Sequence, residues 1–149
     1  MKKQHIKMTI RPMTLKDYDA VIRLWHEGEI PYRPEGRDSR TNIKKQLQQP
    51  NCSFLVAEVD TKIIGAIVGT HDERKGWINR LVVTPSYRKR GIGKRLVKEV
   101  EHHFSKAGID IVACLIEEWN TTSMKVFEHL GYTKHNDILY YSKRKSMKT

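Results

Sequence analysis

The stretch TPSYRKRGIGKRLV, Thr84–Val97, decides the fold. It follows a run of branched apolar residues, WINRLVV, and it opens an apolar stripe in which Ile92, Leu96, Val100 and Phe104 recur four residues apart. This spacing predicts an amphipathic helix that ends near Gly108. The stretch carries six basic residues by Lys98, and it has no acidic residue from Arg88 onward. A strand, a Gly-x-Gly pair in a basic setting and a helix therefore follow one another.

This order is typical of a phosphate-binding turn. The first N–H groups of a helix have no partner within the helix, and they carry a partial positive charge. Glycines let a phosphate approach the backbone closely, because they have no Cβ. A P-loop is excluded, because Arg88 and Arg95 stand where its first Gly and its hydroxyl residue belong. A dinucleotide fingerprint is excluded as well, because Leu96 stands where its third Gly belongs.

The rest of the chain alternates helices and strands around this stretch. Hydrophobic periodicity and turn residues predict helices over 15–27, 41–49 and 122–130, besides the one that begins near Ile92. They predict strands over 8–13, 53–59, 62–71, 77–83 and 109–116, and a final hairpin from 132–135 and 138–144. The strand over 109–116 is almost unbroken in its apolar character, and we expect both of its faces to be covered. The predicted architecture is one mixed α/β domain over 1–149, with disordered tails at 1–6 and 145–149.

Composition limits the setting and the partners. The 149 residues are 38% hydrophobic, and no apolar run approaches the ~20 residues that span a bilayer. The first residues, MKKQHIKMTIRP, carry charges but no apolar core segment, so we expect no signal peptide there. Cys52 and Cys114 lie in apolar runs, which favours buried thiols over a disulfide and predicts a cytoplasmic protein without a membrane partner. The net charge of +11 predicts an anionic partner, which leaves nucleic acid, an anionic membrane surface, a phosphate-rich cofactor or an acidic substrate open.

The motif Arg88-x-x-Gly91-x-Gly93 after an apolar strand resembles the acetyl-CoA-binding motif of the GNAT family, the Gcn5-related N-acetyltransferases. A second stretch, NTTSMKVFEHLGY from Asn120 to Tyr132, looks like a downstream signature of the same family. The resemblance implies the GNAT fold, a mixed and mostly antiparallel sheet of about seven strands. A splayed parallel pair of strands lies at its centre, and about four helices flank it. It also implies acetyl-CoA as co-substrate and no metal.

The resemblance assigns cofactor-binding roles by position. The backbone of Leu81, Val82 and Val83 would bind the pantetheine arm, and Arg88 would open the pyrophosphate site. Backbone N–H groups would hold the pyrophosphate at Lys89, Arg90, Gly91, Ile92, Gly93 and Lys94. Asn120 would lie near the pantetheine. The residues leave other roles open, namely core packing for the apolar side chains, a solvated basic face for the lysines and arginines, and helix capping for Asn120.

Two positions depart from the family pattern. Phe127 stands where many members have a Tyr that protonates the leaving thiolate, and Leu115 stands where related enzymes have a Glu base. Strand alternation would place Glu117 on the same face as Leu115, so we choose Glu117 as the candidate catalytic base. An exposed strand end is the alternative for Glu117. The further candidates for proton transfer are His71, Glu73, Tyr140 and Tyr141. The alternative is a surface position for His71 and Glu73, and a packing role for Tyr140 and Tyr141.

The resulting hypothesis is an acetyl-CoA-dependent N-acetyltransferase in which a primary amine attacks the thioester directly. A catalytically silent CoA sensor and a nucleic-acid-binding module are the alternatives. The basic cluster lacks interleaved aromatic residues beyond Tyr87, which argues against nucleic acid. The loop over 28–39 would meet the acceptor, with Asp38 among the residues able to bind an amine and Arg37 among those able to bind a carboxylate. The sequence leaves open which amine is the acceptor and whether the protein forms a homodimer. His102 and His103 diverge on their helix, so we expect no metal site there.

Overall fold

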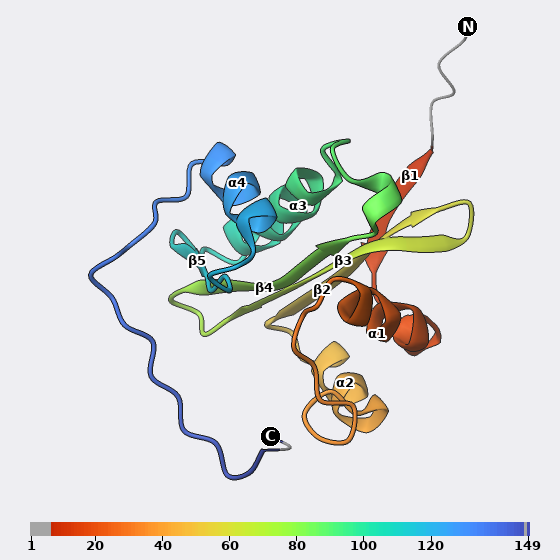
Figure 1. Ribbon diagram of the computed structural model, residues 1–149, viewed down its shortest axis with the longest axis horizontal. Coiled ribbons are helices and arrows are strands. Elements are labelled where there is room, and N and C mark those ends of the chain that lie inside the picture. The colour runs from red at the N-terminus through yellow and green to blue at the C-terminus, as the bar shows by residue number, and fades with distance from the viewer. Residues whose placement is uncertain (1–6, 148) are drawn as a thin grey trace, which may run out of the picture.

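The computed structural model describes residues 7–147 and 149. Within them the chain forms one five-stranded sheet in the order β1-β2-β3-β4-β5 (Figure 1). Strands β1 to β4 are antiparallel neighbours, and β5 is parallel to β4. The strands are β1 (Met8–Pro12), β2 (Cys52–Val59), β3 (Lys62–His71), β4 (Gly76–Val83) and β5 (Val112–Cys114). The expected tail over 1–6 lies outside the described residues.

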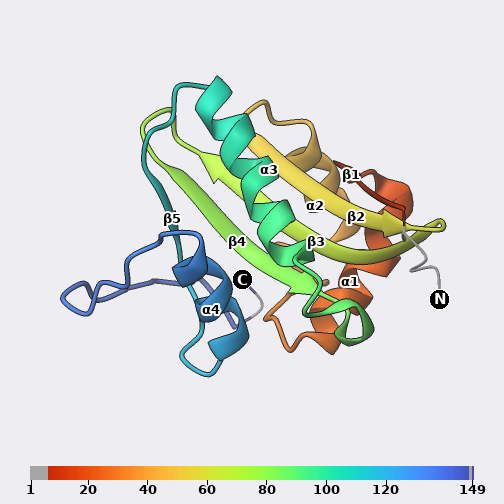
Figure 2. The same ribbon diagram turned by 90° about the horizontal axis from the view of Figure 1, so that it is seen from above.

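Helices cover both faces of this sheet, so the molecule has three layers (Figures 1 and 2). Helices α1 (Tyr18–Glu27) and α2 (Arg40–Leu47) lie on one face, and α3 (Ile92–Lys106) and α4 (Thr121–His129) lie on the other. Each face buries its own core, one beneath α1 and α2 and the other around α3. A 3-10 turn, Leu15–Asp17, precedes α1, and the backbone N–H of Thr14 donates to Asp17 at 2.9 Å. None of the described helices is long and apolar enough to cross a membrane.

Helix α3 packs closely on the sheet because two glycines lie beneath it. A Cβ on Gly76 would lie 2.6 Å from two ring atoms of Phe104. A Cβ on Gly69 would lie 2.4 Å from a methyl group of Val100. Both distances are shorter than real Cβ contacts, so only glycine lets these large apolar side chains reach the strands. The fourfold apolar spacing in α3 and these two glycines together set the height of the helix above the sheet.

The parallel pair β4–β5 splays apart, as the resemblance implied, but it lies at the edge of the described sheet and not at its centre. The two strands pair from Gly76↔Val112 to Ile78↔Cys114, and β4 continues alone on that side to Val83. On its other side β4 contains a bulge, because its register with β3 shifts between Asn79 and Val82. Arg80 lies in this bulge with a positive φ of 56°. The bulge adds local twist to β4, and the divergence of the strands opens a cleft at their carboxyl ends.

Two expectations about strands were wrong. The strand expected over 109–116 is only Val112–Cys114, and it lies at the edge of the sheet with one face uncovered. The expected hairpin over 132–144 does not form, so the described sheet has five strands rather than about seven. Alternating residues give a segment strand propensity, but a strand also needs a neighbour whose backbone groups it can pair with. Residues 133–147, called the C-terminal arm below, run extended outside the sheet (Figure 1).

Candidate functional site

A cleft lies where β4 leaves β5, between the carboxyl end of β4 and the first turns of α3 and α4. The turn that joins β4 to α3 forms one wall of this cleft. Lys89 and Gly91 both have a left-handed backbone in this turn, with φ of 62° and 76°. Gly91 is the residue that caps the N-terminus of α3, and no side chain there supplies a capping hydrogen bond. The turn therefore leaves its backbone donors open to the cleft.

The backbone N–H groups of six consecutive residues, Lys89 to Lys94, have no hydrogen-bond acceptor among the residues that the structure describes. Intrahelical bonding in α3 begins only at Arg95, which donates to the carbonyl of Gly91 at 3.1 Å. The side chain of Arg88 donates through Nε to the carbonyl oxygen of Val83 at 3.0 Å, so it ties the turn to the end of β4. A row of free N–H groups at a helix N-terminus is a favourable site for an anion.

All of the predicted cofactor-binding residues line this cleft except Arg90. The guanidinium of Arg90 lies over the ring of Tyr87, 5.2 Å from its centroid. Val82 is 5% exposed and packs in the core beneath α1, whereas the side chains of Leu81 and Val83 pack against the core around α3. These side chains therefore have the packing role that the sequence left open.

Asn120 caps helix α4. Its Oδ1 accepts a hydrogen bond from the backbone N–H of Ser123 at 3.1 Å, which is the capping role that the sequence left open. Asn120 and Ser123 line the cleft just described and also a second cavity on the other side of this segment. The start of α4 thus forms the partition between the two spaces.

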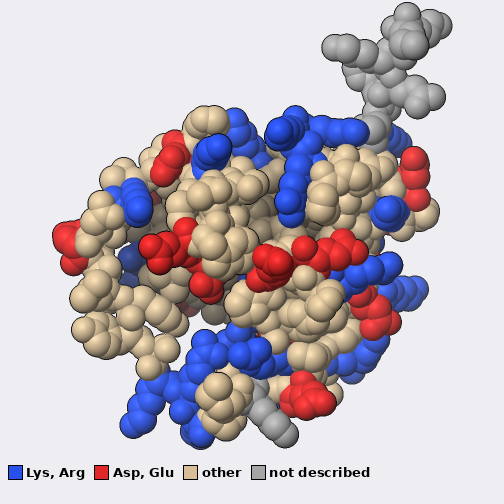
Figure 3. Space-filling model, in the orientation of Figure 1, with Lys and Arg blue, Asp and Glu red and all other residues tan. Residues whose placement is uncertain are grey.

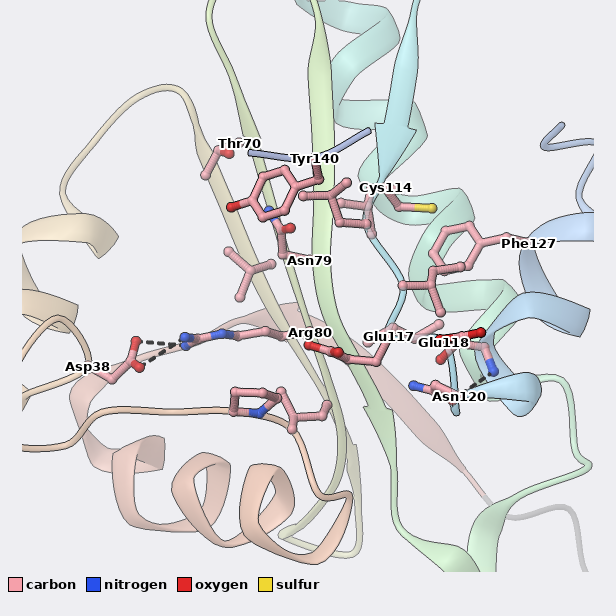
Figure 4. Close-up of a pocket in the computed structure, with 18 of the residues that line it drawn as sticks. Asp38, Thr70, Asn79, Arg80, Cys114, Glu117, Glu118, Asn120, Phe127 and Tyr140 are labelled. Atoms are coloured by element: carbon pink, nitrogen blue, oxygen red, sulfur yellow. Dashed lines mark hydrogen bonds and ion pairs between the residues drawn. The ribbon is translucent and has the colours of Figure 1, made fainter. Parts of the chain in front are cut away.

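The second cavity has a volume of about 700 Å³, within the ~300–1,000 Å³ range of small-molecule sites. Its walls come from the loop over 28–39, the bulge of β4, the segment that follows β5 and the C-terminal arm (Figure 4). The polar side chains on these walls include Arg37, Asp38, Arg80, Glu117, Glu118 and Tyr140. This cavity adjoins the cleft at Leu81, Trp119 and Asn120, so molecules bound in the two spaces would meet there.

An ion pair fixes the loop of the second cavity to the sheet. The guanidinium of Arg80 donates to both carboxylate oxygens of Asp38 at 2.7 and 2.9 Å (Figure 4). The guanidinium also lies 4.4 Å from the centroid of the Trp25 ring. Burial raises the pKa of Asp38, but the hydrogen bonds from Arg80 and from the Arg33 backbone outweigh it, so the pKa lies below its ordinary value.

This pair corrects one expectation and adds one residue. The sequence suggested that Asp38 could bind an amine. In the structure Asp38 is 4% exposed, and both of its carboxylate oxygens accept from Arg80, so it is not free to do so. Sequence reasoning did not single out Arg80. The one local signal was a charged residue inside the mostly apolar run WINRLVV. Its partner lies 42 residues away in a loop, and no spacing rule connects the two.

The model of the acetyltransferase (GNAT) family matches residues 18–132 of the chain, from helix α1 to the residue that follows α4. The match includes the splayed strands, the turn with free N–H groups and the capped start of α4. The chain belongs to the GNAT acetyltransferase family.

Solved structures of other GNAT acetyltransferases share this fold. The aminoglycoside N-acetyltransferase AAC(6')-Iy in complex with CoA is 22% identical, with a TM-score of 0.79 over 97% of this chain and 99% of the other. An aminoglycoside acetyltransferase from an uncultured soil metagenomic sample is 19% identical, with a TM-score of 0.77 over 93% and 97%. A predicted acetyltransferase from Clostridium acetobutylicum, solved with acetyl-CoA, is 14% identical, with a TM-score of 0.76 over 91% and 96%.

Within this GNAT domain, the side chain of Phe127 is buried among other apolar groups. Phe127 is 4% exposed, and its ring meets that of Tyr132 edge-to-face at 4.9 Å. The hydroxyl of Tyr132 donates instead to Glu101 at 3.0 Å, and burial, followed by the charge of Glu101, raises its pKa far above the ordinary value. Neither ring therefore places an acidic proton in the second cavity.

Glu117 lies in the second cavity, although not for the reason that the sequence suggested. Strand β5 ends at Cys114, so strand alternation does not extend to Glu117. Glu117 lies in the turn between β5 and α4, where its carbonyl accepts from the backbone N–H of Asn120 at 2.9 Å. Its side chain is exposed and projects toward that of Arg80 (Figure 4). Glu118, the next residue, lines the same cavity.

The remaining candidates are dispersed. His71 and Glu73 lie outside both spaces, and the ring of His71 accepts a hydrogen bond from the Glu73 backbone. Tyr140 lines the second cavity, whereas Tyr141 is 84% exposed. Among the described residues no cluster of His, Cys, Asp and Glu could hold a metal ion. Cys52 and Cys114 are free and half-buried, and burial raises the pKa of each thiol to about 11.

Proposed function

We propose that this protein is an acetyl-CoA-dependent N-acetyltransferase that acetylates a primary amine. The observation that carries the proposal is the row of unpartnered N–H groups from Lys89 to Lys94 at the start of α3. In this proposal they bind the pyrophosphate of CoA, and the backbone of Leu81, Val82 and Val83 guides the pantetheine arm between the splayed strands. The thioester then reaches the junction of the two spaces near Asn120.

The amine enters from the second cavity in this proposal. Its nitrogen lone pair attacks the thioester carbonyl carbon and forms the C–N bond. The C–S bond then breaks, and the CoA thiolate leaves with the electron pair. The proton of the amine passes to Glu117, directly or through water, and the thiolate needs no donor at the position of Phe127. Juxtaposition of two bound reactants supplies much of the barrier reduction.

A CoA-binding protein without turnover is the second candidate, because Phe127 and Leu115 replace two residues that act as acid and base in relatives. The deciding experiment incubates the protein with acetyl-CoA and a panel of primary amines, and measures released thiol together with product mass. We expect thiol release that requires an amine. Tight CoA binding with no thiol release above the rate without enzyme, for every amine tested, would favour the silent binder.

The position of the cofactor needs its own test, because turnover alone does not locate it. Gly91→Glu places a carboxylate at the start of α3, where it would repel the pyrophosphate and fill the approach to the turn. Titration calorimetry with CoA should show at least a tenfold loss of affinity in the folded variant. An affinity like that of the unaltered chain would disprove the placement.

A further inference from the structure

The charged side chains that line the second cavity carry both signs. They are Arg37, Asp38, Arg80, Glu117, Glu118 and Arg144. Figure 3 shows a hollow on this face of the molecule, and both basic and acidic side chains border it. A site for a polycation would be lined mainly by acidic groups, and a site for a simple anion mainly by basic groups. What this cavity can bind therefore depends on which of its charges are still unpaired.

The carboxylate of Asp38 has no capacity left for a ligand. Its Oδ1 accepts from Nη1 of Arg80 at 2.7 Å, and its Oδ2 accepts from Nη2 of the same residue at 2.9 Å. Oδ2 also accepts from the backbone N–H of Arg33 at 2.7 Å and from Nε of Arg37 at 3.4 Å. Two guanidinium groups thus share one carboxylate, which leaves this wall of the cavity with a surplus positive charge.

Arg37 is the part of this wall that a ligand can reach. Its side chain is 39% exposed, whereas the side chains of Arg80 and Asp38 are 18% and 6% exposed. The two Nη groups of Arg37 donate to no acceptor among the residues that the structure describes. A guanidinium with free donors matches the two oxygens of a carboxylate in a bidentate pair. Arg37 is therefore suited to bind the anionic end of a ligand.

The segment that follows β5 gives the cavity an acidic wall. Glu117 and Glu118 are exposed, and neither forms an ion pair with a residue that the structure describes. In the view of Figure 4 Asp38 lies on one side and Asn120 on the other, with Glu117 between them. Trp119, which is 53% exposed, lines both the cavity and the cofactor cleft. Carboxylates and an indole ring both stabilise a nearby ammonium group, so this wall suits the amino end of a ligand.

We infer that the acceptor is an amino carboxylate, a small molecule whose amine lies at Glu117 beside the cofactor cleft and whose carboxylate is bound by Arg37. This inference rests on the proposed acetyl transfer, because it names the substrate class of that reaction. Each charge of the ligand meets an unpaired charge of opposite sign. An amine without a carboxylate leaves Arg37 unpaired, and a diamine places a second cation against it, so the same wall that attracts the one ligand repels the other.

The first test reads binding and needs no turnover. The protein is loaded with CoA, which has no acetyl group to transfer, and is titrated in a calorimeter with α- and ω-amino acids of increasing chain length. Their amides and the diamines of the same length are titrated in parallel. At least one amino acid should bind about tenfold more tightly than its amide and than the matching diamine. Equal affinities in every set, tighter binding of the diamines, or no binding of any amino acid would overturn the inference.

Two variants test the assignment of the carboxylate to Arg37. Arg37→Gln should bind the preferred amino acid no better than its amide, and Arg37→Glu should prefer the diamine. Arg37 supplies only the longest of the four hydrogen bonds to Asp38, so folding should be retained and is checked by circular dichroism. Arg23→Glu makes the same charge change at an exposed position of α1 that lines neither space, and this control should keep the original preference. An unchanged preference in both Arg37 variants would disprove its role.

Turnover separates this inference from the proposed function. Arg37→Gln should raise the KM for the preferred amino acid about tenfold and change kcat less than about twofold, because Arg37 contacts the end of the ligand that does not react. Thiol release with diamines and none with amino carboxylates would overturn the inference and leave acetyl transfer standing. Selective binding of an amino carboxylate without any thiol release would support the assignment of the ligand and contradict acetyl transfer.

Discussion

At the residue scale, the two glycines of the Gly-x-Gly pair have different reasons to be glycine. Gly91 has a φ of 76°, and a Cβ there would meet nothing within 4 Å, so its requirement is conformational. Gly93 has no positive φ, and a Cβ there would lie 3.7 Å from Leu81 and 3.8 Å from Val126. These are ordinary contacts, so the protein alone would accept alanine at 93. A requirement for glycine there would come from a ligand.

Gly93→Ala therefore tests the cofactor site with little effect on folding. The free energy of unfolding should stay within about 0.5 kcal/mol of the original, because alanine suits the first turn of a helix. Affinity for CoA, measured by calorimetry, should fall at least tenfold, because the methyl group enters the cleft. Gly91→Ala should instead lose about 1 kcal/mol of stability through backbone strain. An unchanged CoA affinity in Gly93→Ala would show that the pyrophosphate does not bind at this turn.

The candidate base is tested by replacing two neighbouring glutamates, one at a time, with glutamine. Glu117→Gln removes the proton acceptor with little change in shape, and kcat on an identified amine should fall more than tenfold, which equals about 1.4 kcal/mol of barrier. The pH profile from 6 to 9 should change in form as well. Glu118→Gln, next to it in the same cavity, is the matched control and should retain most of the rate. Equal rates and profiles for Glu117→Gln and the unaltered chain would exclude Glu117 as the base.

At the element scale, the position of α3 determines the site. The helix contributes the free N–H groups, and its height above the sheet depends on Phe104 and Val100 resting on Gly76 and Gly69. Nothing in the spacing of the apolar residues along α3 indicates which strand positions must be glycine. The contact arises between segments that are about 30 residues apart, so only the folded chain places them together.

Gly76→Ala should lower the free energy of unfolding by about 1–3 kcal/mol, because the new methyl group overlaps the buried ring of Phe104. Urea denaturation measures this loss. The double variant with Phe104→Leu should lose less than the sum of the two single losses, since the smaller side chain makes room for the methyl group. Additive losses in this cycle would show that the overlap is relieved elsewhere.

At the scale of the whole molecule, the ion pair of Asp38 and Arg80 joins two layers. Asp38 belongs to the segment that leads into α2, and Arg80 belongs to strand β4 of the sheet. The pair fixes the wall of the second cavity relative to the bulge of β4. Because the pKa of Asp38 is lowered in the folded chain, its stabilisation is present above the ordinary carboxyl pKa and is lost as the pH falls through the lower folded value.

Asp38→Asn should therefore reduce stability by about 2–3 kcal/mol at pH 7, because Arg80 loses its charged partner in a largely buried place. The difference from the unaltered chain should shrink as the pH falls below the ordinary carboxyl pKa of 3.8. Thermal unfolding across pH 2–7 measures both. Asp19→Asn, which breaks an exposed ion pair with Arg40, should cost less than about 0.5 kcal/mol. A constant difference at every pH would contradict the linkage.

The sequence by itself determined the helices, strands β1 to β4 and the turn at the start of α3, because these depend on short-range patterns. Helix periodicity, the capping pair Thr14 and Asp17, and the turn with Gly91 are each encoded within a few neighbouring residues. The tertiary structure alone decided the pairing of Arg80 with Asp38, the true position of Glu117 and the end of β5 at Cys114. It also decided that residues 132–144 form no hairpin, although their pattern predicts one. Strand formation and ion pairing need a partner distant in sequence, and no local pattern names that partner.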